Sequence, residues 1–370
     1  MGYSRFPSAS DKVFYPNYGW NTPHPADDIC LMDPTPHYPQ NSDDPAFQIC
    51  TMDDPPFYQE KNSDMYGPQQ LLMINDRFKG TSTDTFTKEA TVWNLTTNSS
   101  GKYSQLFNQR VLVVIHGFMT SAKDAESHLL NVASGVEKVY DAVVAYSYPT
   151  GKSPLEYGQA RENAKKAAPR LSNILQFIKI FAQSVSIAAH SMGVFTAFHA
   201  LNQPSSPLID HFYSLGGAFD QKNLLDCSCS VHCTNFPLTL SKITKIFIFY
   251  SCKDDILPLH TFTQGERTVG RIGTFPEQLL AKNVRLIDTS PVVDSHNDYF
   301  DNPHILRSIR LLGSNTLMDH INLTLTTSGF SQENLQVCTV GYDYAIEKGA
   351  ERIGIYINNF FDQAFKQIGL

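Results

Sequence analysis

The sequence predicts a three-layer α/β/α fold, in which helices cover both faces of a mostly parallel, doubly wound sheet. Apolar runs of strand length recur along the chain, at 110–115, 185–189, 245–250 and 283–288. Helix formers with a helical spacing of apolar residues follow the second run, at 192–201. With 370 residues, of which 42% are hydrophobic, the chain is long enough to bury the core of one large domain.

One serine stands between a predicted strand and a predicted helix. The strand at 185–189 and the helix at 192–201 leave Ser191 in a sharp turn. In a nucleophile elbow such a turn projects the serine side chain, and it needs small residues two positions before and two after the serine. Ala189 and Gly193 meet this need. We therefore predict that Ser191 is a catalytic nucleophile.

The strand at 110–115 ends in a His-Gly-Phe sequence, where an enzyme of this kind has its oxyanion loop. Attack by a serine on an ester carbonyl places negative charge on oxygen, and backbone N–H groups can stabilise it. We predict that the N–H groups of Phe118 and Met192 do so, each contributing about 3 kcal/mol. His116 and His190 are expected to be turn residues, with solvated or backbone-bonded rings.

A nucleophilic serine needs a base, and the base needs a carboxylate that orients it. In doubly wound hydrolases the three residues follow the order Ser, Asp, His, each after its own strand. The run at 245–250 is followed by Asp254 and Asp255, and the run at 283–288 by His296. We predict His296 as the base and Asp254 as the acid. Asp255 is expected to be solvated or to cap a helix.

The chain resembles a mostly bacterial family of α/β-hydrolases catalogued as a domain of unknown function. The similarity covers about residues 108–312 and rests on these segments: His116–Phe118, Ser147–Gly151, Tyr157 with Arg161–Ala164, Ala189–Gly193, Arg271–Gly273 and His296 with Tyr299–Phe300. The proline four residues after Asp254 matches the acid loop of such enzymes. The chain differs in having Tyr148 where the family has Trp, and in a cysteine-rich insertion at 227–233. The resemblance implies the three-layer fold and a Ser-Asp-His triad, and leaves the substrate open.

These observations favour a serine carboxyl-ester hydrolase that needs no metal and no organic cofactor. Its substrate would be a small-molecule or lipid ester, and lipid esters are slightly favoured by four apolar residues near the predicted loops: Phe118, Met119, Met192 and Phe195. Two alternatives stay open. The same triad could transfer the acyl group to an alcohol, or the scaffold could be a non-catalytic adaptor that displays tyrosine motifs.

The charge is concentrated at the beginning of the chain. Residues 1–68 hold ten acidic and three basic residues and 11 of the 21 prolines. Such a composition cannot offset the entropy of ordering, so we expect this segment to be disordered or an extended strap, and to repel nucleic acid. The hydrolase domain is predicted over 69–370, with a C-terminal extension at 313–370. That extension contains a strand-like run at 321–327 and apolar residues at helical spacing over 345–368.

The acidic segment contains a repeat. Pro25–Tyr38 and Pro45–Tyr58 share eight identities in fourteen positions. Repeated short motifs in such segments often bind partners, and the second copy contains Pro55, Pro56 and Tyr58 in the Pro-Pro-x-Tyr pattern that WW domains bind. The alternatives are chance, because Pro and Tyr are frequent here, and packing of the repeats on the hydrolase surface.

No run approaches the roughly 18 apolar residues of a membrane span, and the N-terminus lacks the apolar core of a secretory signal. A cytoplasmic protein, or one exported without a conventional signal peptide, is therefore expected. Most of the seven cysteines should then be reduced. Three of them lie with a histidine in 227–233, where free thiols are favoured over a zinc site because the spacing is tighter than in zinc knuckles.

Overall fold

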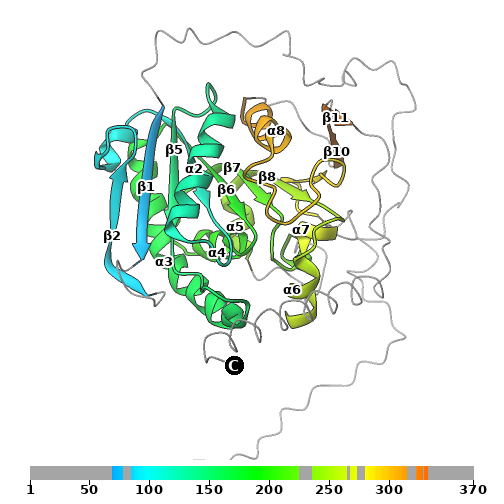
Figure 1. Ribbon diagram of the computed structural model, residues 1–370. Coiled ribbons are helices and arrows are strands. Elements are labelled where there is room, and N and C mark those ends of the chain that lie inside the picture. Colours follow the sequence, from blue (N-terminus) through cyan, green and yellow to red (C-terminus); the bar gives the residue numbers. More distant parts are fainter. Residues whose placement is uncertain are drawn as a thin grey trace, which may run out of the picture. The chain divides into compact units, whose positions relative to one another are not determined.

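The structure is a computed structural model, and it describes residues 69–77, 85–224, 236–264, 267–272, 280–314, 322–327 and 329–331. Within these ranges the strands form one 11-stranded sheet, which runs from β2 and β3 at one edge to β11 at the other (Figure 1). The strands are β1 Gln70–Arg77, β2 Phe86–Asn94, β3 Ser99–Ser100, β4 Arg110–Ile115, β5 Ala142–Ser147, β6 Ser184–His190, β7 Ile209–Leu215, β8 Ile243–Tyr250, β9 Val284–Asp288, β10 Asn322–Thr326 and β11 Gly329–Ser331.

The sheet is mostly parallel. Its order is β11-β10-β9-β8-β7-β6-β4-β5-β1-β2-β3, and all pairs from β10 to β1 are parallel. The outer strands β2, β3 and β11 pair antiparallel with their neighbours. The order reverses at β4, which lies between β5 and β6. Loops that leave the carboxyl ends of β4 and β6 therefore diverge at a topological switch point, where open α/β sheets bind ligands.

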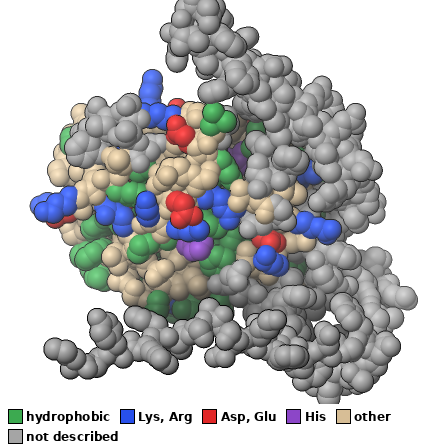
Figure 2. Space-filling model, turned by 90° about the horizontal axis from the view of Figure 1, so that it is seen from below, with side chains coloured by type: hydrophobic (Ala, Val, Ile, Leu, Met, Phe, Trp, Pro, Cys, Tyr) green, Lys and Arg blue, Asp and Glu red, His purple; other side chains and the backbone are tan. Residues whose placement is uncertain are grey.

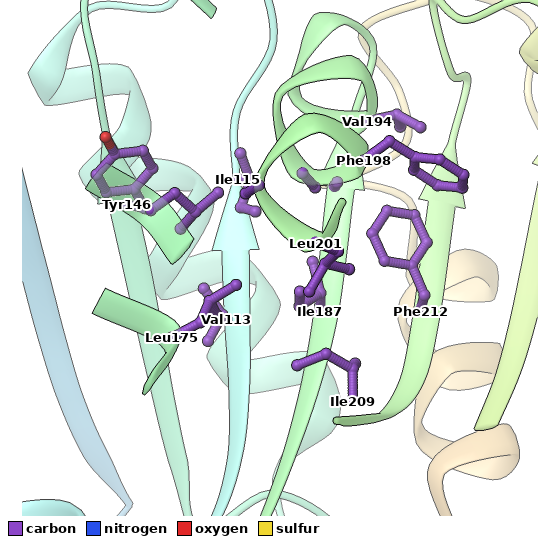
Figure 3. Packing of buried hydrophobic residues seen from close by; sticks show 14 of the residues in the cluster. Val113, Ile115, Tyr146, Leu175, Ile187, Val194, Phe198, Leu201, Ile209 and Phe212 are labelled. Carbon is purple, nitrogen blue, oxygen red and sulfur yellow. The ribbon is translucent and has the colours of Figure 1, made fainter. Parts of the chain in front are cut away.

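Both faces of the sheet are buried, as the continuous apolar runs predict for parallel strands. Along β4, Val111, Val113 and Ile115 belong to one core cluster, and Leu112 and Val114 to the other. The first cluster includes the helices α3 (Tyr157–Phe181) and α4 (Met192–Leu201). Figure 3 shows part of it, with side chains of β4, β6 and β7 packed beneath α4. The second includes α2 (Ala122–Val136) and α8 (Pro303–Ser314). The predicted three layers are confirmed.

The predicted elements agree with the observed ones to within one or two residues at most ends. The run at 110–115 is β4, the helix at 192–201 is α4, and the runs at 245–250 and 283–288 lie in β8 and β9. Three further helices, α5 (Pro237–Lys242), α6 (Leu257–Gln264) and α7 (Val269–Ile272), lie in the connections on either side of β8. The sequence did not predict β1 and β2.

The strand β1 is anchored to α3 by an ion pair between a buried Asp76 and a partly exposed Arg170. The carboxylate of Asp76, which is fully buried, accepts hydrogen bonds from the guanidinium of Arg170, from Tyr146 Oη at 2.9 Å and from Thr87 Oγ1 at 3.1 Å. Such a carboxylate is acceptable in a core because each of its oxygens has a partner. The pair therefore fixes β1 beside β5 and against the helical layer.

Some sequence predictions concern residues outside the described ranges. These are the acidic segment 1–68 with its repeat and the Pro55, Pro56 and Tyr58 motif, the cysteine-rich insertion 227–233, and the helical spacing over 345–368. Among the described helices, none is both long and apolar enough to cross a membrane. In the same residues no group of three or more His, Cys, Asp or Glu side chains is arranged to hold a metal ion.

The surface charge is mixed where it can be seen. On the face shown in Figure 2, Lys and Arg side chains are interspersed with acidic, apolar and other polar ones. Several of the described basic groups have acidic partners, such as Lys179 with Asp210 at 3.5 Å and Lys222 with Asp220 at 2.8 Å. This face therefore differs from the uniformly basic surfaces that bind nucleic acid.

Candidate active site

Ser191 occupies a strained turn between β6 and α4. Its φ of 54° and ψ of −122° lie in a region that residues with a side chain rarely adopt, at a cost of about 1–3 kcal/mol. Neighbouring backbone holds it there. The N–H of Ser191 donates to the carbonyl of Leu215 at 3.0 Å, and its own carbonyl accepts from Val194 and Ala218, both at 3.1 Å. The turn is a nucleophile elbow in its backbone geometry.

Two glycines let the elbow and the loop after β4 approach each other. A Cβ on Gly193 would lie 2.6 Å from the carbonyl oxygens of both Ile115 and His116. A Cβ on Gly117 would lie 2.8 Å from the Cβ of Ser191. The small residue required after the serine is thus explained by backbone contact with the end of β4.

The three predicted triad residues come together. Ser191 Oγ lies 2.8 Å from His296 Nε2, and His296 Nδ1 lies 2.7 Å from Asp254 Oδ2. They follow β6, β9 and β8 respectively, and their exposed fractions are 6%, 5% and 2%. With the proton of Nδ1 directed at the carboxylate, Nε2 is free to accept the hydroxyl proton of the serine. The geometry therefore allows general-base activation of Ser191.

Both aspartates of the acid loop contact the histidine loop. Asp254 Oδ1 accepts from the backbone N–H groups of Ile256 and Leu257 at 3.1 and 3.0 Å, which leaves Oδ2 for the imidazole. Asp255 Oδ1 accepts from the backbone N–H of His296 at 3.1 Å. Asp255 is half-buried, and the contact of its carboxylate with the backbone of the histidine loop is one that the sequence did not predict.

Two further histidines surround the triad without contacting the serine hydroxyl. His190 Nε2 donates to the carbonyl of His296 at 2.8 Å, and their rings lie 4.7 Å apart. Burial and then His296 lower the pKa of His190 well below its ordinary value, so the ring is neutral. His116 Nδ1 donates to the carbonyl of Gly117 at 2.9 Å. Both rings are backbone-bonded, one of the two states that the sequence predicted.

The two predicted oxyanion donors flank Ser191. Met192 is the first residue of α4, where backbone N–H groups have no partner within the helix. Phe118 follows Gly117, whose backbone packs against the Cβ of Ser191. Neither N–H donates to an acceptor among the described residues. Both are therefore available to an atom bound beside the serine, and the positive end of α4 favours negative charge there.

A series of aromatic contacts leads from Phe118, in the loop after β4, to α6, the helix after Asp254 and Asp255. The ring of Phe118 meets Tyr157 edge-on, with centroids 5.1 Å apart. The hydroxyl of Tyr157 is hydrogen-bonded to Nδ1 of His260, a buried residue of α6. His260 could not be recognised from the sequence, because nothing in its local pattern marks it. These contacts connect the loop after β4 with α3 and α6.

Two cavities lie away from the triad. One of about 450 Å³ lies between α2 and α8 and is lined by Gly135, Leu306 and Arg310 among others. The second, of about 300 Å³, lies along α3 and α4, where Arg161 and His199 line it. Neither is lined by a triad residue, so neither identifies the substrate.

The fold and this site define an α/β-hydrolase. The chain belongs to the family described as alpha/beta hydrolase of unknown function (DUF900), whose model matches residues 96–314. This match confirms the resemblance seen in the sequence, and it contains Ser191, Asp254 and His296. A comparison with curated proteins gave no match.

Solved structures similar to this chain include three esterases. The Pyrobaculum calidifontis esterase has 13% identity and a TM-score of 0.33, covering 56% of this chain and 76% of its own. Est1E from Butyrivibrio proteoclasticus has 15% identity and a TM-score of 0.35, and the match covers 56% of this chain and 89% of its own. An esterase from Pyrococcus furiosus has 15% identity and a TM-score of 0.34, and the match covers 68% of this chain and 86% of its own. The family match, rather than these distant similarities, establishes the class of the chain.

Proposed function

We propose that the protein is a serine carboxyl-ester hydrolase. The observation that carries this proposal is the continuous contact from Ser191 Oγ through the His296 ring to Asp254, with the serine on a strained elbow. Such an arrangement turns a hydroxyl into a nucleophile without any metal.

In the proposed reaction, Ser191 Oγ attacks the ester carbonyl carbon while His296 Nε2 takes its proton. Asp254 orients the ring and stabilises the imidazolium. The negative oxygen of the tetrahedral intermediate accepts hydrogen bonds from the N–H groups of Phe118 and Met192. The intermediate collapses, His296 returns the proton to the departing alkoxide, and an acyl-serine remains. Water, deprotonated by His296, then releases the carboxylic acid and restores the serine.

The acyl chain of the substrate is less defined. Met192 and Phe195, two of the four apolar residues that favoured lipid esters, are only 1% and 6% exposed and belong to the core. Met119, by contrast, is 44% exposed in a turn with a φ of 56°. Of these four residues, the two in the loop after β4, Phe118 and Met119, are therefore the ones exposed enough to contact an acyl chain, and the proposal is limited to carboxyl esters as a class.

The test is covalent labelling with a fluorophosphonate probe. We expect the wild-type protein to be labelled and Ser191→Ala to be folded but unlabelled. Ser214→Ala is a matched control, because its hydroxyl is buried on the neighbouring strand β7 and has no hydrogen-bond partner among the residues that the structure describes. It should be labelled like the wild type. Equal labelling of Ser191→Ala would overturn the assignment of the nucleophile, and an unlabelled wild type would favour the adaptor. The ratio of acid to ester product with added alcohol separates hydrolysis from acyl transfer.

A further inference from the structure

The ring of His116 is held in a single tautomer by two donors. The guanidinium of Arg77, at the end of β1, donates from Nη2 to His116 Nε2 at 2.9 Å. The backbone N–H of Tyr148 donates to the same nitrogen at 3.2 Å. Neither of these N–H groups can accept a hydrogen bond, so Nε2 must be the acceptor and the ring proton must be on Nδ1.

This tautomer fixes the orientation of one predicted oxyanion donor. The Nδ1–H of His116 donates to the carbonyl of Gly117 at 2.9 Å. That carbonyl and the N–H of Phe118 belong to the same planar peptide unit, in which they point in opposite directions. Fixing the carbonyl oxygen therefore aims the Phe118 N–H, on the other side of the peptide, without any contact to the N–H itself.

Arg77 also holds the far end of the same loop. Its Nη2 donates to the carbonyl of Thr120 at 2.5 Å, and its Nε donates to Ser147 Oγ at 2.9 Å. Between the two fixed carbonyls, of Gly117 and Thr120, lies the strained turn at Met119. One guanidinium thus restrains both ends of residues 117–120, directly at one end and through the imidazole at the other.

We propose that Arg77 is a positioning residue for the oxyanion site, acting through the Nδ1–H tautomer of His116 on the Gly117–Phe118 peptide. The proposal rests on the proposed hydrolase function. It assigns a role in the site to a residue of β1, which lies outside the family match at 96–314.

The electrostatics of the site agree with a neutral imidazole. Burial first, and the charge of Arg77 second, lower the pKa of His116 well below its ordinary value. The ring also stacks on Tyr148, with centroids 4.8 Å apart and planes 12° from parallel. A protonated His116 would direct an Nε2–H at the guanidinium and at the Tyr148 N–H, so the cation is excluded by geometry as well as by charge.

The first test compares Arg77→Met with Arg110→Met in steady-state hydrolysis of a p-nitrophenyl ester. Arg110 is a matched control, because its guanidinium is similarly placed in a hydrogen-bonded pair, with Asp141 at 2.9 Å, but at the opposite end of β4. An oxyanion donor acts in the transition state, so Arg77→Met should lower kcat about 10- to 100-fold with little change in KM. Arg110→Met should keep the wild-type kcat. Equal kcat values for both variants and the wild type would overturn the proposal.

The second test uses His116 and covers the case in which Arg77→Met does not fold. His116→Asn offers an amide N–H near the position of Nδ1 and nothing at Nε2, whereas His116→Leu offers neither. We expect the kcat of His116→Asn to stay near the wild-type value and the kcat of His116→Leu to fall well below it. Adding Arg77→Met to His116→Leu should lower kcat by a much smaller factor than Arg77→Met lowers it in the wild type, because both substitutions disrupt the same chain of hydrogen bonds. Additive losses, or no rescue by asparagine, would contradict the route through His116.

A direct measurement of the His116 tautomer distinguishes a positioning role of Arg77 from a general effect on stability. The ¹⁵N chemical shifts of His116 should identify Nε2 as the nitrogen without a proton in the wild type, and a protonated Nε2 would overturn the proposal. Failure of the proposed function looks different. If the fluorophosphonate does not label the wild type, the hydrolase assignment fails, whereas a labelled, active protein with an insensitive Arg77 refutes the positioning role alone.

Discussion

The carboxylate of Asp255 accepts a hydrogen bond from the backbone N–H of His296, while the adjacent carboxylate of Asp254 binds the ring of the same residue. Two consecutive side chains thus fix the main chain and the side chain of one histidine. Lys253 extends the contact with an ion pair to Asp294 at 2.6 Å. That pair is exposed and contributes little to stability. The two aspartates act together with two further hydrogen bonds between these loops, from Ser251 Oγ to the carbonyl of Val293 at 2.8 Å and from the N–H of Cys252 to Ser290 Oγ at 2.9 Å.

Substitutions of Asp254 and of Asp255 should lower kcat to very different extents. Asp254→Asn is expected to lower kcat for p-nitrophenyl ester hydrolysis by about 10⁴-fold, because the amide favours the wrong tautomer of His296. Asp255→Asn should be nearly neutral, since its remaining carbonyl oxygen can still accept from the His296 N–H. Asp255→Ala removes that acceptor and should be clearly slower than Asp255→Asn. If Asp255→Asn proved the more damaging of the two amide variants, the roles would be reversed.

Backbone contact at the elbow predicts a steric effect of Gly193→Ala. The new Cβ would press on two carbonyl oxygens of the β4 loop, so we expect the serine to be displaced and kcat to fall by about 100-fold. Gly158→Ala in α3 is the matched control, because a Cβ there would meet no atom of the described part of the chain within 4 Å. It should leave kcat unchanged and stabilise the helix by up to about 1 kcal/mol. Full activity in Gly193→Ala would show that the backbone at the end of β4 can move away from α4 without loss of function.

His199 should make the folded protein sensitive to acid. Burial, followed by Lys165 and Arg161, lowers the pKa of His199 to about 4, whereas an unfolded histidine has a pKa of about 6.5. Between these values the unfolded chain binds a proton that the folded chain does not, so the free energy of unfolding falls as the pH decreases from 6.5 towards 4.

Replacing His199 by Gln removes this titration. We expect the thermal midpoint of His199→Gln to decline less steeply than that of the wild type below about pH 6.5, whatever the offset between them at about pH 8. Thermal unfolding followed by circular dichroism over this range measures both slopes. Parallel declines would mean that His199 is already accessible to protons in the folded state.

The Pro-Pro-x-Tyr motif predicts binding of WW domains by the acidic segment. In titrations of the full chain with a panel of labelled WW domains, Tyr58→Ala should remove most of the binding, because the tyrosine and the proline pair fill adjoining aromatic grooves. Tyr38→Ala is the control, since the first copy has Thr35 where the motif needs a proline. Binding that is unchanged in Tyr58→Ala would leave packing of the repeats on the hydrolase surface as the leading explanation.

The sequence could predict which three side chains of the candidate site meet, because each of them follows a separate apolar strand in a fixed order. Parallel strands place their carboxyl ends at one edge, so Ser191, Asp254 and His296 had to approach one another once the strands were assigned. Gly193 was predicted for a related reason, since a sharp turn leaves no room for a larger residue.

Other parts of the site had no local pattern. Arg77 belongs to β1, which pairs with β5 through a register that only the folded sheet defines. Likewise, the contact of Asp255 with the His296 backbone joins residues 41 positions apart. A charged residue near a motif has many possible partners in sequence, and it is the geometry of the fold that selects one.

The position of β1 also sets where a working fragment can begin. A fragment that starts at residue 96, the boundary of the family match, would retain the whole triad but lack β1 and β2. It would expose the edge of β5, a fully buried strand, to pairing with other molecules, and it would leave the β4 loop without Arg77. We therefore expect a fragment starting at residue 69 to be soluble and active, and one starting at residue 96 to aggregate.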